Sequence, residues 1–218
     1  DNFAVHLQFL EEYFRVVLSG IDVQALEYLN NLIVELYNRK GIGSQSNFAR
    51  LKATDYPIFD DLNELILEKL NHATIDYDVV NLRILANFIS KFSKNGRDSN
   101  LWNGESTLTI KENFTVFNFQ SLLANKNGVI ANAQMLLVLK YLDNEIIKNR
   151  EYNIKYHANR KIIIVIDEAH VFIDSKFPLA LDFMYQMAKR IRKYNGMQIV
   201  ITQNIKDFVG SEELARKS

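Results

Sequence analysis

The chain has 218 residues, of which 48% are hydrophobic, so it is long enough for one α/β domain or for a domain with a sizeable insert. Lysine plus arginine equal aspartate plus glutamate at 26 each, so the net charge does not indicate a polyanionic partner, and any basic function must be local. The absence of cysteine excludes disulfides and thiolate metal sites. No apolar run is long enough to span a bilayer, and no signal peptide is visible.

The first part of the chain, residues 3–93, predicts an all-helical module. Apolar residues recur at helical spacing over three segments: 3–18, 23–37 and 78–92. A further helix is expected to begin near Thr54 or Asp55, with Pro57 in its first turn. No convincing strand interrupts these patterns.

The second part, residues 94–218, predicts a parallel α/β core. A polar connection leads into strand-like and helical segments in this order: strands 107–110 and 114–119, helix 129–150, strand 161–166, helix 177–195, strand 197–202 and a helix from Lys206. Alternation of strand and helix is typical of a parallel sheet. The near-continuous apolar run of residues 161–166 predicts a strand that is buried on both faces.

The helix expected over residues 177–195 has Pro178 at its start and Gly196 just after its end, as helix termini favour. Its apolar residues follow a spacing of four and three, which predicts that they are core: Phe177, Leu181, Met184, Ala188 and Ile191.

Two carboxylates, Asp167 and Glu168, follow the strand at 161–166 directly. Ligands of parallel sheets bind at the carboxyl ends of strands, and apolar residues followed by Asp-Glu are the Walker B pattern of P-loop ATPases. The pattern predicts that Asp167 holds Mg²⁺ through water and that Glu168 orients and deprotonates the attacking water. A strand that merely ends in two acids at a turn is the simpler alternative.

The strand at 197–202 ends in Thr202 and Gln203. A neighbouring strand can deliver a polar sensor to the γ-phosphate, and an amide can hydrogen-bond to phosphate or to the attacking water. An ordinary polar cap of the strand is the alternative to this sensor hypothesis.

Four cations gather at the end of the 177–195 helix: Lys189, Arg190, Arg192 and Lys193. Complementing the helix dipole accounts for some of them. Arg192 lies closest to the apolar stripe by helical angle, whereas Arg190 and Lys193 point more outward. An arginine at such an edge is able to reach a nucleotide bound by a neighbouring subunit, as an arginine finger does.

The phosphate-binding loop that should accompany this chemistry is absent from the sequence. Walker A requires G-x-x-x-x-G-K-[ST], and none of the eight glycines is followed by lysine. The chain begins without methionine and stops within a helical pattern, so we expect it to be a fragment whose phosphate-binding loop lies before Asp1. A trimmed whole domain is the alternative.

The other motifs in the sequence give weaker indications of function. The letters "DEAH", Asp167 to His170, are typical of a helicase, but Ile201-Thr202-Gln203 differs from the Ser-Ala-Thr-like motif expected on the next strand. The four histidines have no metal-ligand spacing, "NGES" at 103–106 is most simply a turn, and Trp102 is interpreted as a packing residue.

The segment from Lys161 to Ser218 resembles the C-terminal ATPase domain of type IV secretion and conjugative-transfer ATPases, the TrbE/TraE-type members of the FtsK–HerA group. The resemblance rests on "IVIDEAHVFID", "RIRKYNG" and "TQN" followed by "DF", and more weakly on "LWNGES" and "FTVFNFQSL". It implies a RecA-like P-loop ATPase core, incomplete because its Walker A part is missing, with a helical insert at residues 3–93.

The resemblance implies an ATP- and Mg²⁺-dependent motor, commonly hexameric, at the cytoplasmic face of the cell membrane, where it acts with other secretion-system components in pilus assembly and substrate transfer. Asp167 would be the Mg²⁺ carboxylate, Glu168 the base and Gln203 the sensor, with Arg192 and Lys193 near a subunit boundary. Two alternatives stay open: a DNA-pumping coupling ATPase of the same group, and a degenerate NTPase-like scaffold that binds a partner. Nucleic acid is a possible partner that the net charge does not indicate.

Overall fold

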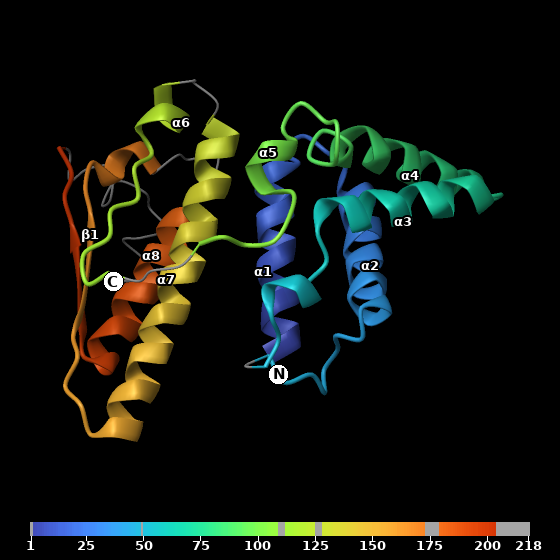
Figure 1. Cartoon of the computed structure of the whole chain (residues 1–218). Helices are drawn as coiled ribbons and strands as arrows, with labels where there is room; N and C mark the ends of the chain where they lie inside the picture. Colours follow the sequence, from blue (N-terminus) through green and yellow to red (C-terminus); the bar gives the residue numbers. More distant parts are fainter. Residues whose placement is uncertain (1, 49, 109–111, 125–127, 173–178, 204–218) are drawn as a thin grey trace. The chain divides into compact units, whose positions relative to one another are not determined.

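The computed structural model describes residues 2–48, 50–108, 112–124, 128–172 and 179–203. The chain forms two compact units, Asp1–Phe117 and Asn118–Ser218 (Figure 1). Residues 94–117, which the sequence analysis placed at the start of the second domain, therefore belong to the helical unit.

The first unit is helical throughout its regular structure. Its elements are α1 (Asn2–Val17), α2 (Val23–Arg39), the short turn η1 (Ala53–Asp55), α3 (Phe59–His72), α4 (Asp76–Ile89) and the single-turn α5 (Ser99–Trp102). The helices predicted over 3–18, 23–37 and 78–92 are thus confirmed. α2 packs against both α3 and α4, and the core between these helices includes Leu29, Ile66, Leu85 and Ile89, all fully buried.

Trp102 is a packing residue, as predicted. Its ring centroid lies 5.7 Å from that of Tyr13 and 5.3 Å from that of Phe92. Tyr13 is almost completely buried, and burial raises the pKa of its hydroxyl well above the usual value. The contact between Trp102 and Tyr13 attaches α5 to α1.

The predicted start of α3 is wrong. Thr54 and Asp55 form the separate turn η1, and α3 begins at Phe59. The residue before Pro57, Tyr56, is extended with φ −79° and ψ 144°, as steric conflict with a following proline favours. The helix therefore cannot run through Pro57, and the Asp61 carboxylate instead accepts a hydrogen bond from the Ile58 N–H at 2.9 Å.

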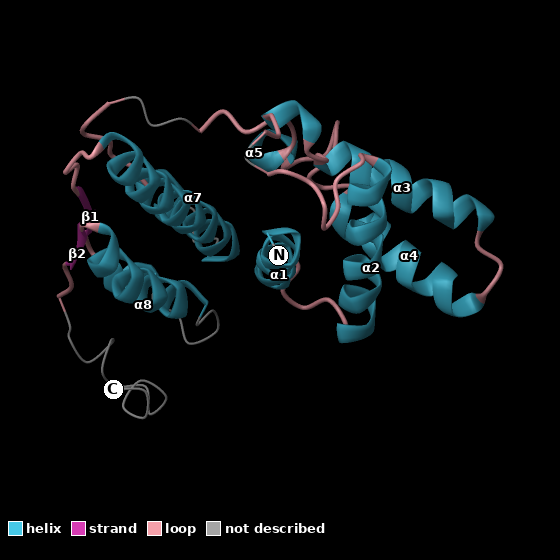
Figure 2. Cartoon of the chain, turned by 90° about the horizontal axis from the view of Figure 1, so that it is seen from below, coloured by secondary structure: helices cyan, strands magenta, loops and turns pink. Residues whose placement is uncertain are grey.

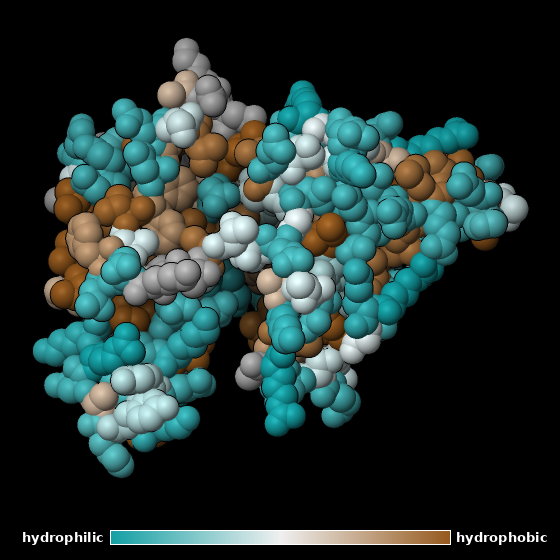
Figure 3. All heavy atoms as spheres, viewed as in Figure 1, coloured by the Kyte–Doolittle hydropathy of each residue, from teal (hydrophilic) through white to brown (hydrophobic). Residues whose placement is uncertain are grey.

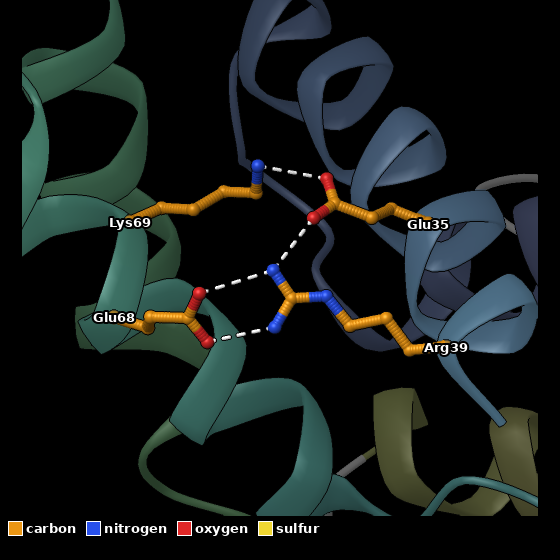
Figure 4. Close-up of polar contacts among 4 residues, drawn as sticks. All are labelled: Glu35, Arg39, Glu68 and Lys69. Carbon is orange, nitrogen blue, oxygen red and sulfur yellow. Dashed lines mark hydrogen bonds and ion pairs between the residues drawn. The ribbon is translucent and has the colours of Figure 1, made fainter.

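Four charged side chains connect α2 to α3 (Figure 4). The two terminal nitrogens of Arg39 donate to the two Glu68 oxygens at 2.7 and 3.0 Å. One of these nitrogens, Nη2, also donates to Glu35 Oε1 at 2.9 Å. Lys69 Nζ lies 2.7 Å from the other Glu35 oxygen. This alternating network is solvent-accessible, so it adds orientation more than stability to the packed helices.

The second unit is α/β. Its elements are α6 (Gln120–Ala124), α7 (Gly128–Tyr156), β1 (Ile162–Ile166), the short turn η2 (Ala169–Phe172), α8 (Leu179–Ile191), the short turn η3 (Arg192–Tyr194) and β2 (Gly196–Val200). β1 and β2 are parallel, with register from Ile162 opposite Gly196 to Ile166 opposite Val200. The helix predicted over 129–150 is confirmed and continues to Tyr156. The helix expected from Lys206 lies outside the described residues.

The strand predicted over residues 114–119 is wrong. Phe114 and Val116 are 85% and 71% exposed, and the segment has no regular structure before α6. In the described sheet β1 pairs with β2, so these residues lack the neighbouring ladder that would make them a strand. Of the other predicted strand, residues 107 and 108 are not in a strand, and 109–110 lie outside the described residues.

α7 and α8 lie side by side and cover the same face of the strands (Figures 1 and 2). Between them and the strands lies one hydrophobic core: Met135, Leu139, Ile146, Ile164, Ile166, Ala169, Met184, Met187 and Ile191. The core positions predicted on α8 are confirmed for Met184 and Ile191, whereas Leu181 and Ala188 are only partly buried. Phe177 lies outside the described residues.

The prediction that the 161–166 strand is buried on both faces is wrong. Ile164 and Ile166 are buried, but Ile163 and Val165 are 59% and 56% exposed. Both packed helices lie on one face, and nothing in the described ranges covers the other. Hydrophobic residues accordingly gather on the surface over the strands (Figure 3).

The predicted glycine cap of α8 is also wrong. Asn195, with φ 62° and ψ 41°, takes the left-handed conformation that ends the helical segment, which asparagine tolerates better than most residues. Gly196 is the first residue of β2, and an added Cβ would lie 2.4 Å from Ile191 Cγ1 and 2.9 Å from the Ile162 carbonyl oxygen. Gly196 is therefore required for close packing rather than for its backbone angles.

Within the described part of the chain, no helix is both long and apolar enough to cross a membrane.

Candidate functional site

The carboxyl ends of β1 and β2 meet at one edge of the sheet. Their parallel register brings Ile166 opposite Val200, and the ladder continues one step further, because the Ile201 N–H donates to the Ile166 carbonyl at 2.9 Å. The Ile201 carbonyl in turn accepts from the Ala169 N–H at 2.9 Å. The backbone after β1 is thus attached to the backbone after β2.

This attachment requires a turn at the acidic pair, Asp167 and Glu168. Glu168 has φ 48°, a left-handed conformation that costs a non-glycine residue on the order of 1 kcal/mol. Asp167 Oδ1 accepts the Glu168 N–H at 2.9 Å, and the Glu168 carbonyl accepts the Val171 N–H at 2.9 Å. These hydrogen bonds offset the strain and leave both carboxylates exposed at the sheet edge.

The structure brings the acidic pair together with the polar end of β2. The side-chain amide of Gln203 donates to Glu168 Oε1 at 2.9 Å. Thr202, beside it, is half-buried. The other Glu168 oxygen, Oε2, lies 3.1 Å from His170 Nδ1. A carboxylate, an amide and an imidazole therefore meet where the sequence predicted a base and a sensor.

The basic residues predicted as candidates lie at the opposite end of the strands. Arg192 and Lys193 are exposed in η3, which precedes the amino end of β2, while the acidic pair follows the carboxyl end of β1. A strand of this length separates its ends by roughly 16 Å. Within one chain, Arg192 and Lys193 are therefore not brought to Glu168.

Arg190 has a partner within its own unit. Its guanidinium is paired with Oδ2 of Asp143 on α7. The Asp143 side chain is only 6% exposed, whereas that of Arg190 is 41% exposed. The pair connects α7 to α8, and the nearby Lys189 Nζ lies 4.2 Å from the centroid of the Tyr185 ring.

A divalent metal fits the acidic pair only if other ligands contribute. The described residues contain no group of three or more His, Cys, Asp or Glu side chains that could hold a metal. Mg²⁺ keeps several waters and is commonly held by one or two carboxylates together with substrate phosphates. Asp167 and Glu168 fit that mode of binding, and they do not form a closed cage for a structural metal.

Sequence reasoning missed two participants. His170 was set aside with the helicase motif, although its position two residues after Glu168 was the signal for a contact across one turn. Asp143 gave a second signal, as an acidic residue among the buried apolar positions of α7. The sequence predicted neither the contact of His170 with Glu168 nor that of Asp143 with Arg190, because both depend on how turns and helices meet.

The fold is that of a P-loop ATPase. The family model described as the TraG P-loop domain matches residues 22–217, so the chain belongs to the TraG P-loop domain family. Among solved structures, the chain is similar to VirB4 of Thermoanaerobacter pseudethanolicus, with 28% identity and a TM-score of 0.81 over 98% of this chain and 53% of that one. Among curated proteins none matches.

The resemblance to type IV secretion and conjugative-transfer ATPases is thereby confirmed. The chain spans about half the length of the VirB4 chain that it matches. Membership of a P-loop ATPase family implies nucleotide binding.

Proposed function

We propose that the chain is part of an ATP-hydrolysing motor of a type IV secretion or conjugation system, one that energises pilus assembly and substrate transfer. The observation that carries the proposal is the hydrogen bond between Gln203 and Glu168 at the shared carboxyl edge of β1 and β2. A carboxylate held beside an amide at this edge is suited to activating water next to a phosphate.

In this mechanism Glu168 accepts the proton of the attacking water, and the Gln203 amide orients that water or the γ-phosphate. Asp167 would hold Mg²⁺ through water, and the ion would neutralise phosphate charge when bound. Asp167 already accepts the Glu168 N–H, so its carboxylate is held against the Glu168 backbone. Thr202, which directly precedes Gln203, contributes a second polar group to the nucleotide site.

The phosphates need a further cradle. The 218-residue sequence contains no G-x-x-x-x-G-K-[ST], whose backbone N–H groups and lysine hold the β- and γ-phosphates. We therefore expect the chain by itself to bind Mg-ATP weakly and to hydrolyse it poorly. Tight, Mg²⁺-dependent ATP binding by the 218-residue chain, measured by calorimetry, would contradict this expectation.

The proposed motor is a hexamer located peripherally at the cytoplasmic face of the cell membrane, with other secretion-system components as partners. Arg192 and Lys193, exposed and remote from Glu168 of the same chain, are suited to act across a subunit boundary. Arg190 is the less suitable member of the cluster, because Asp143 already holds its guanidinium.

The test of the proposed function is Glu168→Gln in the full-length protein. We expect ATP binding to persist while hydrolysis falls by at least about 100-fold, because the water-activating group is removed. Unchanged turnover in Glu168→Gln would exclude Glu168 as the base. A wild-type protein that binds no ATP would instead favour the degenerate, partner-binding scaffold.

A DNA-pumping ATPase of the same group is the second candidate, and one surface favours it. The end of α7 and the turn into β1, residues 148–161, carry five Lys and Arg against a single acid, Glu151. Tyr152 and Tyr156 are exposed there, with ring centroids 4.6 Å apart. Cations interleaved with exposed rings are suited to the phosphates and bases of single-stranded nucleic acid.

η3 extends this basic surface, because Arg150 lies over the Tyr194 ring at 4.8 Å. Fluorescence anisotropy with a labelled oligonucleotide at two salt concentrations tests the second candidate. We expect salt-sensitive binding that Lys155→Glu with Lys161→Glu weakens. Binding that is absent, or that this double substitution leaves unchanged, would remove the DNA-pumping candidate.

A further inference from the structure

His170 lies on η2, one turn after the acidic pair, and its ring faces the candidate base. Its Nδ1 is 3.1 Å from Glu168 Oε2. The side chain is 30% exposed, but Nδ1 itself is shielded from solvent and has no well-aligned hydrogen-bond partner among the described residues. Catalytic hydrogen bonds are often poorly aligned without substrate and tighten when it binds.

Gln203 contacts the same carboxylate from another side. Its amide donates to Oε1, while His170 approaches Oε2. A glutamate held at one oxygen can still rotate about its terminal bond, and fixing such a long side chain costs conformational entropy. Contacts at both oxygens define the plane and the direction of the carboxylate.

The two contacts are not equivalent during the reaction. The Gln203 amide lies at the end of β2, where a sensor for phosphate is expected, so the arriving γ-phosphate or the attacking water competes with Glu168 for its N–H groups. Oε1 then becomes free to accept a proton. His170 belongs to the turn that follows β1. The backbone hydrogen bond from Ala169 to Ile201 holds that turn in place whether or not Gln203 contacts Glu168.

We propose that His170 is a positioning residue that holds Glu168 Oε2, so that Oε1 faces the attacking water once Gln203 engages the phosphate. The inference rests on the proposed ATPase function. In the step that it serves, the water oxygen bonds to the γ-phosphorus and its proton passes to Oε1. The bond from the γ-phosphorus to ADP breaks, and ADP retains the electron pair.

The position of the nitrogen, rather than the bulk of the ring, is the property under test. The asparagine amide nitrogen is as many bonds from Cα as His Nδ1, whereas the glutamine amide nitrogen is one bond further. His170→Asn therefore keeps a donor near Oε2, His170→Gln misplaces it, and His170→Ala removes it. Asn and Gln differ little in polarity, so they are matched controls for each other.

The experiment measures ATP hydrolysis and ATP binding by the full-length protein and these three variants. We expect His170→Ala and His170→Gln to lower kcat by about 10- to 100-fold, as a misplaced catalytic group does, with ATP affinity within about twofold of the wild type. His170→Asn should retain most of the wild-type kcat. In a Glu168→Gln background, His170→Ala should cause no further loss.

Wild-type kcat in His170→Ala would overturn the inference, as would equal loss in the Asn and Gln variants, which would indicate a merely structural ring. If His170→Ala does not fold, the comparison of His170→Asn with His170→Gln still tests the inference. The two proposals fail separately: an active Glu168→Gln enzyme defeats the ATPase mechanism, whereas an inactive Glu168→Gln beside a fully active His170→Ala defeats only the positioning role.

Discussion

The Gln203 amide nitrogen lies 2.9 Å from Glu168 Oε1, although 35 residues separate the two along the chain. The contact follows from the parallel register of β1 and β2 and from the backbone bonds at Ile166, Ala169 and Ile201. The contact gives the candidate base Glu168 a hydrogen-bond donor, Gln203, that can donate to a phosphate instead.

Gln203→Ala in the full-length protein should lower kcat by about 10- to 100-fold, because the carboxylate and the phosphate both lose their shared donor. ATP affinity should change much less, since one amide is a small part of the contacts that hold a nucleotide. Steady-state hydrolysis with a separate binding assay distinguishes the two effects. A variant with raised KM and unchanged kcat would show that Gln203 binds nucleotide without taking part in the chemical step.

The strand ends of the site could be predicted from the sequence because they depend on local pattern. A branched apolar run indicates a strand, and polar residues directly after two parallel strands must meet at one edge. Asp167, Glu168 and Gln203 were found in this way. The helices α1, α2 and α4 of the first unit could be predicted equally well, because each carries a helical apolar repeat.

The remainder depended on packing that no local pattern records. Arg190 and Asp143 are 47 residues apart and meet because α7 and α8 lie on the same face of the strands. The exposed sheet face could not be foreseen, because an apolar strand looks the same whether one or both of its faces are covered. The end of the helical segment formed by α8 and η3, at Asn195, was missed because a glycine follows it, and glycine is the commoner cap.

Arg190→Ala should destabilise the 218-residue chain by about 1 to 3 kcal/mol, because it leaves the buried Asp143 carboxylate without its partner. Arg192→Ala is the matched control, since Arg192 is exposed in η3, and it should stay within about 0.5 kcal/mol of the wild type. Urea unfolding followed by circular dichroism measures both.

A second variant tests whether the lost stability comes from the unpaired charge of Asp143 or only from the lost contact with Arg190. Adding Asp143→Asn to Arg190→Ala removes the unpaired charge and should recover part of the lost stability. Equal free energies of unfolding for Arg190→Ala and Arg192→Ala would mean that the pair does not hold α7 to α8.

Gly196→Ala should destabilise the second unit by about 1 to 3 kcal/mol, because the new methyl group would overlap the buried Ile191 side chain and the Ile162 carbonyl oxygen. Gly43→Ala is the control, since its nearest atom would be Asn38 Oδ1 at an ordinary 3.6 Å. Thermal unfolding compares the two variants. A Tm for Gly196→Ala equal to that of the control would show that β2 can move away from α8 at little cost.

The charged network of α2 and α3 predicts a pH dependence of stability. Partial burial raises the pKa of Glu35, but hydrogen bonds from Lys69 and Arg39 outweigh it and bring the pKa below its ordinary value of 4.5. The hydrogen bond from Arg39 likewise lowers the pKa of Glu68. A carboxylate whose folded pKa is lowered stabilises the fold above its unfolded pKa, and loses that contribution as the pH falls through the folded value.

Glu35→Gln with Glu68→Gln should therefore be less stable than the wild type at pH 7, and the difference should shrink steadily as the pH falls below about 4.5, where protonation removes the same charges. High salt should shrink it as well, because the network is exposed. Glu27→Gln, exposed on the same helix, should show neither trend. Urea unfolding from pH 7 to pH 3 measures the difference, and a gap that is constant over this range would exclude the network as its source.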